Sequence, residues 1–197
     1  ISQTGMDVLQ YQGKYPVIFL TFKDVKESSF EAAYKKIYRL IINVYDEFSY
    51  LLESPSLSDQ QKDYFSRILK GEANQAELET SLQELTGFLF RHHGTKPIIL
   101  IDEYDTPIQS GYLQGYYDNI IAFFRNFFGA ALKDNPYLFK AVLTGILRVS
   151  RESLFSGLNN LKVHSVLHPQ FSSFFGFTEE EVNQLLNKAG FQDKAED

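Results

Sequence analysis

Apolar residues along this chain alternate between short continuous runs and longer segments with helical spacing. The runs at residues 15–22 (YPVIFLTF), 98–101 (IILI) and 137–144 (YLFKAVLT) have the length and composition of strands. Over residues 30–52 and 75–91 the apolar positions recur every three or four residues, which predicts amphipathic helices. Because strands that alternate with helices are typical of an α/β fold, we expect a three-layer core with a parallel sheet and helices on both faces.

Further helices are predicted at residues 58–69, at residues 116–132 and from Thr178 onward. The first of these begins at Ser58 or Asp59. Thr178 and Glu181 form the T-x-x-E pattern of a capping box at the start of the last one. We expect residues 1–170 to form the α/β core and residues 171–197 to begin a following helical segment.

Two adjacent carboxylates follow the second predicted strand. Asp102 and Glu103 come directly after Ile98–Ile101, an apolar run that predicts a strand buried on both faces. Open α/β sheets bind ligands at the carboxyl ends of their strands, where a first carboxylate can hold Mg²⁺ through water and a second can orient an attacking water. The pair therefore predicts the Walker B motif of a nucleotide site. A strand that only meets a solvated turn, with Thr106-Pro107 starting a helix, is the structural alternative.

The third predicted strand supplies further candidates. Parallel neighbouring strands end side by side, so Thr144 is expected to approach Asp102 and Glu103. Its hydroxyl could contact a γ-phosphate or the attacking water, and a strand cap is the alternative. Arg148 and Arg151 follow shortly, and an arginine beside phosphate neutralises charge that develops in the transition state. A solvated loop position is the alternative for both arginines.

Composition narrows the classes of protein. The 197 residues are 44% hydrophobic and 22% charged, as in globular domains, and the formal net charge of -6 argues against strong direct binding of nucleic acid. Cysteine is absent, which excludes disulfides, thiolate zinc sites and cysteine nucleophiles. We find no apolar run long enough to span a membrane and no signal peptide, so we expect a cytoplasmic protein. Since the chain opens at Ile1, we also expect a fragment of a longer protein.

Five stretches, in order and over almost the whole chain, carry a family resemblance. They are YPVIFLTFKDVKESSFEAAYKKI, RILKGEANQAELETSLQEL, IILIDEYDTPIQ, AVLTGILRVSRESLFSGLNNL and FFGFTEEEV. With them the chain resembles the predicted AAA-ATPase-like family of bacterial and archaeal proteins, which often carry a nuclease-like PD-(D/E)XK domain at the C-terminus. The most specific of the matching motifs are DEYDTPI and LFSGLNNL.

The resemblance implies a P-loop NTPase core of the AAA (ASCE-like) type that uses ATP and Mg²⁺. It implies that Asp102 is the carboxylate associated with the metal, Glu103 the base that orients water, and Thr144 the sensor on the next strand. Asp105 completes the DEYDTP signature and is assigned to the nucleotide-binding set. The two arginines named above become candidates for a phosphate sensor or an arginine finger. The resemblance also implies a possible nuclease-like effector attached at the C-terminus.

The phosphate-binding Walker A loop, G-x-x-x-x-G-K-[ST], is missing from the sequence. Neither Gly13-Lys14 nor Gly94-Thr95-Lys96 has its spacing. In the family this loop lies upstream of the strand that begins at Tyr15, so we expect a core that lacks its N-terminal P-loop strand. Such a sheet should either have a gap beside the sensor strand or pair differently. We expect this chain alone to be inactive as an ATP hydrolase.

Three functions remain open. The first is the greater part of an ATPase domain that hydrolyses Mg-ATP in the full-length protein, as a switch or motor for an attached effector. The second is a metal-dependent nuclease centred on Asp102, Glu103 and Asp105, which the acidic charge balance disfavours. The third is a non-catalytic interaction module whose aromatic segment 116–128 contacts a partner. The sequence leaves the effector, its trigger, a homo-oligomer, the source of any arginine finger and the role of Ser156–Asn160 open.

Overall fold

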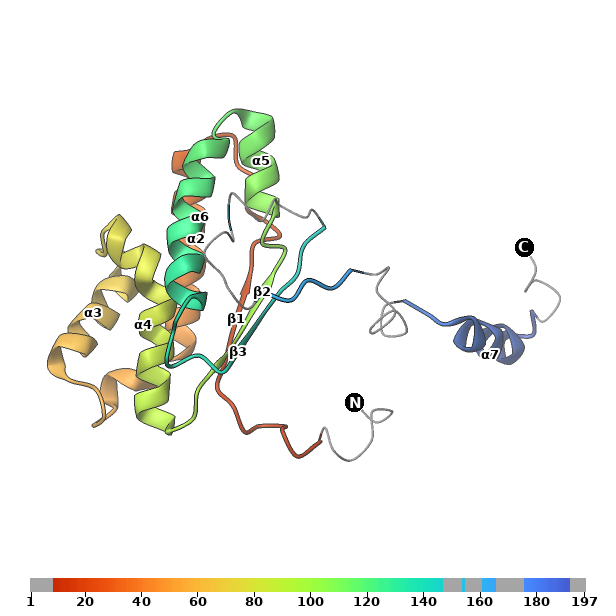
Figure 1. The fold of residues 1–197 in the computed structure, drawn as a ribbon, viewed down its shortest axis with the longest axis horizontal. Coiled ribbons are helices and arrows are strands. Elements are labelled where there is room, and N and C mark those ends of the chain that lie inside the picture. The colour runs from red at the N-terminus through yellow and green to blue at the C-terminus, as the bar shows by residue number, and fades with distance from the viewer. Residues whose placement is uncertain (1–8, 147–153, 155–160, 166–175, 192–197) are drawn as a thin grey trace. The chain divides into compact units, whose positions relative to one another are not determined.

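The computed structural model describes residues 9–146, 154, 161–165 and 176–191 (Figure 1). The elements, in chain order, are β1 (Val17–Thr21), α2 (Phe30–Glu47), the 3₁₀ helix η1 (Ser49–Glu53), α3 (Asp59–Lys70), α4 (Gln75–His93), β2 (Ile98–Asp102), α5 (Thr106–Gln114), α6 (Tyr117–Leu132), β3 (Lys140–Leu143) and α7 (Glu179–Ala189). Contacts divide the chain into two units, Ile1–Asn159 and Asn160–Asp197. The predicted domain boundary at residue 170 lies outside the described residues. No helix in the described part of the chain is long and apolar enough to cross a membrane.

The three described strands form one parallel sheet in the order β1-β2-β3 (Figure 1). Thr21 at the end of β1 is in register with Asp102, and Ile101 is in register with Leu143 of β3. The predicted α/β class with a parallel sheet is therefore confirmed. Because all three strands run the same way, their carboxyl ends lie at one edge, which brings Asp102 between the end of β1 and the end of β3.

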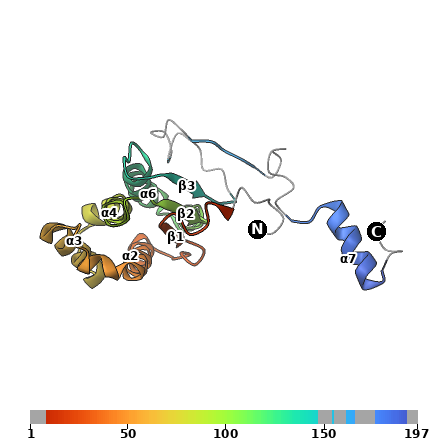
Figure 2. The same ribbon diagram turned by 90° about the horizontal axis from the view of Figure 1, so that it is seen from below.

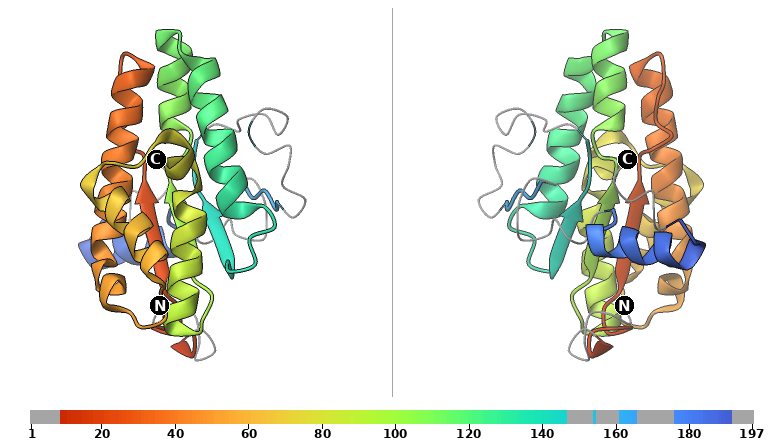
Figure 3. Two further views of the ribbon diagram at one scale, coloured as in Figure 1. Left: turned by 90° about the vertical axis from the view of Figure 1, so that its left-hand side faces the viewer. Right: turned by 90° about the vertical axis from the view of Figure 1, so that its right-hand side faces the viewer.

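The two faces of the sheet differ in what covers them. Side chains that are at most 2% exposed line one face, namely Ile18, Leu20, Ile99 and Ile101. On the other face Val17, Phe19 and Val142 are 43%, 52% and 47% exposed. The described helices α2, α4 and α6 lie on one side of the strands (Figure 2), and they stand in front of the sheet in the left view of Figure 3.

The prediction that strand 98–101 is buried on both faces, with helices on both sides, is wrong for the described residues. The physical reason is the strand order. The steps from β1 to β2 and from β2 to β3 go in the same direction across the sheet. Since connections between parallel strands are right-handed as a rule, two successive steps in one direction place both connections on the same face.

The helices begin and end where local side chains satisfy their terminal backbone groups. Ser58 and Asn74 form capping boxes at the starts of α3 and α4, and Thr178 forms one at the start of α7. The predicted capping box of Thr178 and the predicted start of a helix at Ser58 or Asp59 are confirmed. The helix predicted over residues 30–52 is instead α2 followed by η1. Phe48 separates them, because its backbone at φ -109 and ψ 19 leaves the helical region.

Aromatic side chains fill the space between the helices and the sheet. The ring of Phe124 stacks on Phe128 with centroids 4.9 Å apart and meets Phe22, the residue after β1, edge-on at 5.1 Å. The four phenylalanines of α6 are at most 1% exposed, namely Phe123, Phe124, Phe127 and Phe128. The aromatic segment that offered a partner surface is thus part of the core.

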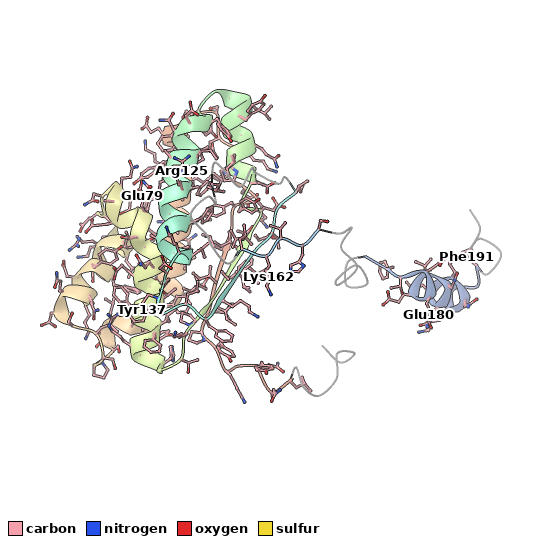
Figure 4. All side chains as sticks on the ribbon, viewed as in Figure 1. Glu79, Arg125, Tyr137, Lys162, Glu180 and Phe191 are labelled. Atoms are coloured by element: carbon pink, nitrogen blue, oxygen red, sulfur yellow. The ribbon has the colours of Figure 1, made fainter. Side chains whose placement is uncertain are left out.

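Helices α4 and α6 run side by side along the middle of this layer. Glu79 of α4 and Arg125 of α6 mark the two helices in Figure 4, and Asn126 Nδ2 donates a hydrogen bond to Glu79 Oε2 at 3.0 Å. At the lower end, the guanidinium of Arg91 lies 5.1 Å from the ring centroid of Tyr137, which precedes β3. We refer to α2, α3, α4 and α6 together as the helical layer.

Candidate functional site

Asp102 lies at the centre of the polar edge formed by the strand ends. Its two carboxylate oxygens accept hydrogen bonds from two different strands. Thr144 Oγ1 donates to Oδ1 at 2.6 Å, and Thr21 Oγ1 donates to Oδ2 at 3.2 Å. Each carboxylate oxygen has a second acceptor position, so the half-buried Asp102 can still bind a metal ion or its water ligands.

The structure thus brings Thr144 to Asp102, and it adds a residue that sequence reasoning missed. Thr21 is 81 residues from Asp102 in sequence but directly in register with it. One signal was available, because Thr21 is the polar residue near the end of the apolar run YPVIFLTF, at the same sheet edge as the acidic pair. Hydroxyl donors on both oxygens hold the Asp102 carboxylate in one orientation.

Glu103 adopts a backbone conformation that is rare for residues other than glycine. Its φ of 51° lies in the left-handed region, which costs of order 1–3 kcal/mol and is concentrated at functional sites. The side chain is held as well, since Thr106 Oγ1 donates to Glu103 Oε2 at 3.1 Å. Thr106 is the first residue of α5, so the start of this helix holds the Glu103 carboxylate.

Asp105 lies in a different environment from the other two acidic residues. It is 1% exposed, and its Oδ2 accepts a hydrogen bond from Gln109 Nε2 at 3.0 Å. It precedes α5 without capping the helix through its side chain. Within the described part of the chain, Asp102, Glu103 and Asp105 therefore accept hydrogen bonds from different residues. Among the described residues no group of three or more His, Asp or Glu side chains is arranged to hold a metal ion.

The oxygen atoms at Asp102 are suitable ligands for Mg²⁺ or its bound waters, whereas the sequence supplies no loop that would bind the phosphates. Magnesium in nucleotide sites is held by one or two carboxylates, retained waters and substrate phosphates, so a single oriented aspartate beside hydroxyls suffices for the protein side. The phosphate-binding loop has no counterpart in the sequence. Two other candidates, Arg148 and Arg151, lie outside the described residues, as does the segment Ser156–Asn160.

A hollow of about 340 Å³ lies at the opposite end of the sheet. It is lined by Gly13, Lys14, Tyr15, Pro16, Phe48, Tyr50, His93 and Thr95. Since Pro16 and Thr95 precede β1 and β2, this hollow is at the amino ends of the strands. There Tyr50 Oη and His93 Nε2 are 2.8 Å apart, and partial burial together with the neighbouring His92 lowers the pKa of His93. The hollow is separate from the acidic edge.

Comparison with known proteins assigns the chain to a family. Residues 3–155, well over half of the chain, match the family described as "Predicted AAA-ATPase". The parallel sheet and the acidic end of β2 both lie within this match. The chain therefore belongs to this AAA-ATPase-like family.

One relative is similar to part of the chain and is considerably longer than the matched region. The chain is 34% identical over 94 residues to a protein of Azotobacter chroococcum mcd 1 described as "Uncharacterized protein in vnfD 5'region". The match covers 47% of this chain and 18% of that protein, so the chain spans less than a fifth of the relative's length. No solved structure matches the chain.

Proposed function

We propose that this chain is the greater part of an ATPase domain that binds and hydrolyses Mg-ATP in the full-length protein. The observation that carries the proposal is the arrangement of Asp102 between two threonine hydroxyls, with Glu103 held next to it in a strained turn. Strain that the surrounding structure maintains at a polar strand end is typical of preorganised functional sites. Membership of the AAA-ATPase-like family supports the same class of reaction.

In this proposal each residue has one task. Asp102 holds Mg²⁺ through water, and the ion when bound neutralises charge on the phosphate oxygens. Glu103 orients the attacking water and accepts its proton, which requires a carboxylate fixed close to the metal ligand. The hydrogen bond from Thr106 supplies that fixation. While its hydroxyl donates to Asp102, Thr144 Oγ1 accepts a hydrogen bond from the attacking water, and it contacts the γ-phosphate when its single proton turns from Asp102 to the phosphate.

The free edge of the sheet is compatible with a missing phosphate-binding strand. In the described residues the strand order ends at β3, so the outer edge of β3 has no neighbour. The family resemblance places the P-loop strand beside the sensor strand, which here is β3. A strand added at this edge would bring its loop next to Thr144. We propose that Arg148 and Arg151 follow there as phosphate sensor or finger, and that the attached effector is nuclease-like.

The test is steady-state Mg-ATP hydrolysis by the full-length protein and by its Glu103→Gln variant. We expect the variant to bind ATP with an affinity close to that of the wild type and to lose roughly 100-fold or more in turnover, because it keeps the shape but cannot accept a proton. Glu47→Gln, at the exposed end of α2, is the matched control and should hydrolyse ATP normally. If neither the wild type nor the variant binds or hydrolyses ATP, the proposal is wrong and the interaction-module alternative takes its place.

A further inference from the structure

Asp105 and Gly145 meet across the ends of β2 and β3. Asp105 is 1% exposed, which is unusual for a carboxylate. Its Oδ2 accepts a hydrogen bond from Gln109, and its Oδ1 lies close to Gly145, two residues after β3. A Cβ atom built on Gly145 would lie 2.5 Å from Asp105 Oδ1 and 2.8 Å from Tyr104 Cε1. The buried carboxylate therefore occupies the space that any side chain at position 145 would need.

Gly145 is required for this close approach and not for a special backbone angle. It is not among the glycines with positive φ, in contrast to Gly94 and Gly115, which have φ of 68° and 80° and open space around them. Gly145 therefore differs from the glycines that end helices. Its lack of a side chain allows a contact between Asp105 and Gly145, which are 40 residues apart in the sequence.

This contact adjoins the hydrogen bond between Thr144 and Asp102. Backbone bonds hold Thr144 on one side, since Thr144 N donates to Ile101 O at 2.9 Å and Tyr104 N donates to Thr144 O at 3.1 Å. The next residue, Gly145, rests against Asp105. A shift of Gly145 would move Thr144 Oγ1 away from Asp102 Oδ1, which is now 2.6 Å away.

We propose that Asp105 is a positioning residue, whose buried carboxylate packs against Gly145 and so sets the hydrogen bond between Thr144 and Asp102. The proposal rests on the proposed ATPase function for its effect on turnover. It replaces direct contact of Asp105 with the nucleotide, because a side chain that is 1% exposed and bound to Gln109 faces the protein interior. The DEYDTP signature then combines a metal-binding residue, a base and a residue that aligns the neighbouring strand.

The test compares Gly145→Ala with the double variant Gly145→Ala/Asp105→Ala in the full-length protein. The added methyl group should displace Thr144 and lower ATP turnover by roughly 10- to 100-fold, with the Kd for Mg-ATP changed far less. Removal of the carboxylate makes room for the methyl group, so the double variant should recover part of the lost turnover. Gly129→Ala, which adds a Cβ with nothing within 4 Å, should leave turnover unchanged.

A second measurement is independent of activity. The methyl NMR signal of Thr144, recorded without nucleotide, should shift in Gly145→Ala, return toward the wild-type position in the double variant and stay unchanged in Gly129→Ala. An unshifted Thr144 signal in Gly145→Ala, or a double variant that recovers none of the turnover lost in Gly145→Ala, would overturn the positioning role. If the wild type hydrolyses no ATP while the Thr144 signal behaves as expected, the proposed function fails and the positioning contact stands.

Discussion

In the helical layer, side chains are buried against one another and helices are capped by their own sequence, whereas at the strand ends polar groups stay half-exposed and one backbone is strained. Phe124 and Phe128 stack at 4.9 Å without exposure to solvent. At the end of β2, Glu103 and its neighbours form the opposite arrangement, with a positive φ and carboxylates bound to hydroxyl groups.

The difference separates the part of the molecule that stabilises the fold from the part that we propose carries the reaction. In the helical layer the backbone conformations that the residues prefer agree with the packing of their side chains. Substitutions there should therefore change the free energy of unfolding. The strand ends depart from local preference at Glu103 and bury a carboxylate at Asp105, which are departures that proteins tolerate at functional sites. Substitutions there should change turnover and leave stability unchanged or even improved.

The largest effect is expected for Phe124→Ala in the helical layer. Phe124 is fully buried between Phe22 and Phe128, so its removal leaves a cavity and should lower the free energy of unfolding by about 3–5 kcal/mol. Urea denaturation measures the loss. Phe177→Ala, at a side chain that is 72% exposed, is the control and should change stability by less than about 0.5 kcal/mol. Equal effects of the two variants would contradict the assignment of the core.

Thr144→Val tests the strand ends. The variant removes the hydroxyl that donates to Asp102 Oδ1 at 2.6 Å and should lower ATP turnover by about 10- to 100-fold, equivalent to about 1.4–2.7 kcal/mol in the activation barrier. The free energy of unfolding should change by no more than about 0.5 kcal/mol, because Thr144 is exposed. Thr21→Val removes the longer bond of 3.2 Å and should cost less turnover. A reversed order would show that Thr21 and not Thr144 orients the carboxylate.

Glu103→Gly should stabilise the protein and abolish turnover. Glycine adopts the φ of 51° without the steric cost, so relief of strain, less the entropy of the more flexible unfolded chain, should raise the free energy of unfolding by about 1 kcal/mol. Asp134→Gly, at the other non-glycine residue with positive φ in the described part of the chain, should bring a similar gain with normal turnover. Denaturant titrations of both variants measure the relief of backbone strain, and ATPase assays measure the loss of turnover. A destabilised Glu103→Gly variant would argue against strain at this position.

The smallest effect is a loss of stability at high pH that comes from the helical layer. Burial raises the pKa of Tyr45 well above its ordinary value near 10, and burial also raises the pKa of Tyr64 to about 12. Because both pKa values are higher in the folded than in the unfolded state, the neutral tyrosines contribute their full stability below pH 10. This contribution is lost as the pH rises from 10 through the pKa values of the folded state. The free energy of unfolding should therefore fall above pH 10.

Tyr45→Phe should make that decline less steep. At pH 7 the variant should lose about 1 kcal/mol, because it lacks the hydrogen bond from Tyr45 Oη to Ser81 O at 2.7 Å. Urea denaturation at pH 8 and pH 11 measures the difference between wild type and variant. Tyr112→Phe, at a side chain that is 74% exposed, should follow the wild type at both pH values. If Tyr45→Phe declines as steeply as the wild type, Tyr45 is not a source of the alkaline sensitivity.

The amino-acid sequence by itself determined the features that depend on near neighbours. The spacing of apolar residues predicted β1, β2 and β3 and most of the helices, and Thr178 with Glu181 predicted the capping box of α7. The position of Asp102 and Glu103 at a strand end also followed from the sequence, because a run of four apolar residues ends there. These patterns act over a few residues, so a single segment contains all of the information.

Only the tertiary structure decided which residues meet across the sheet. The hydrogen bond between Thr21 and Asp102 and the approach of Asp105 to Gly145 join segments 81 and 40 residues apart, and both depend on strand register. The one-sided cover of the sheet depends on the direction of two successive crossovers. The left-handed backbone of Glu103 has no local cause in the sequence, since a residue other than glycine adopts it only when the surrounding contacts outweigh its steric cost.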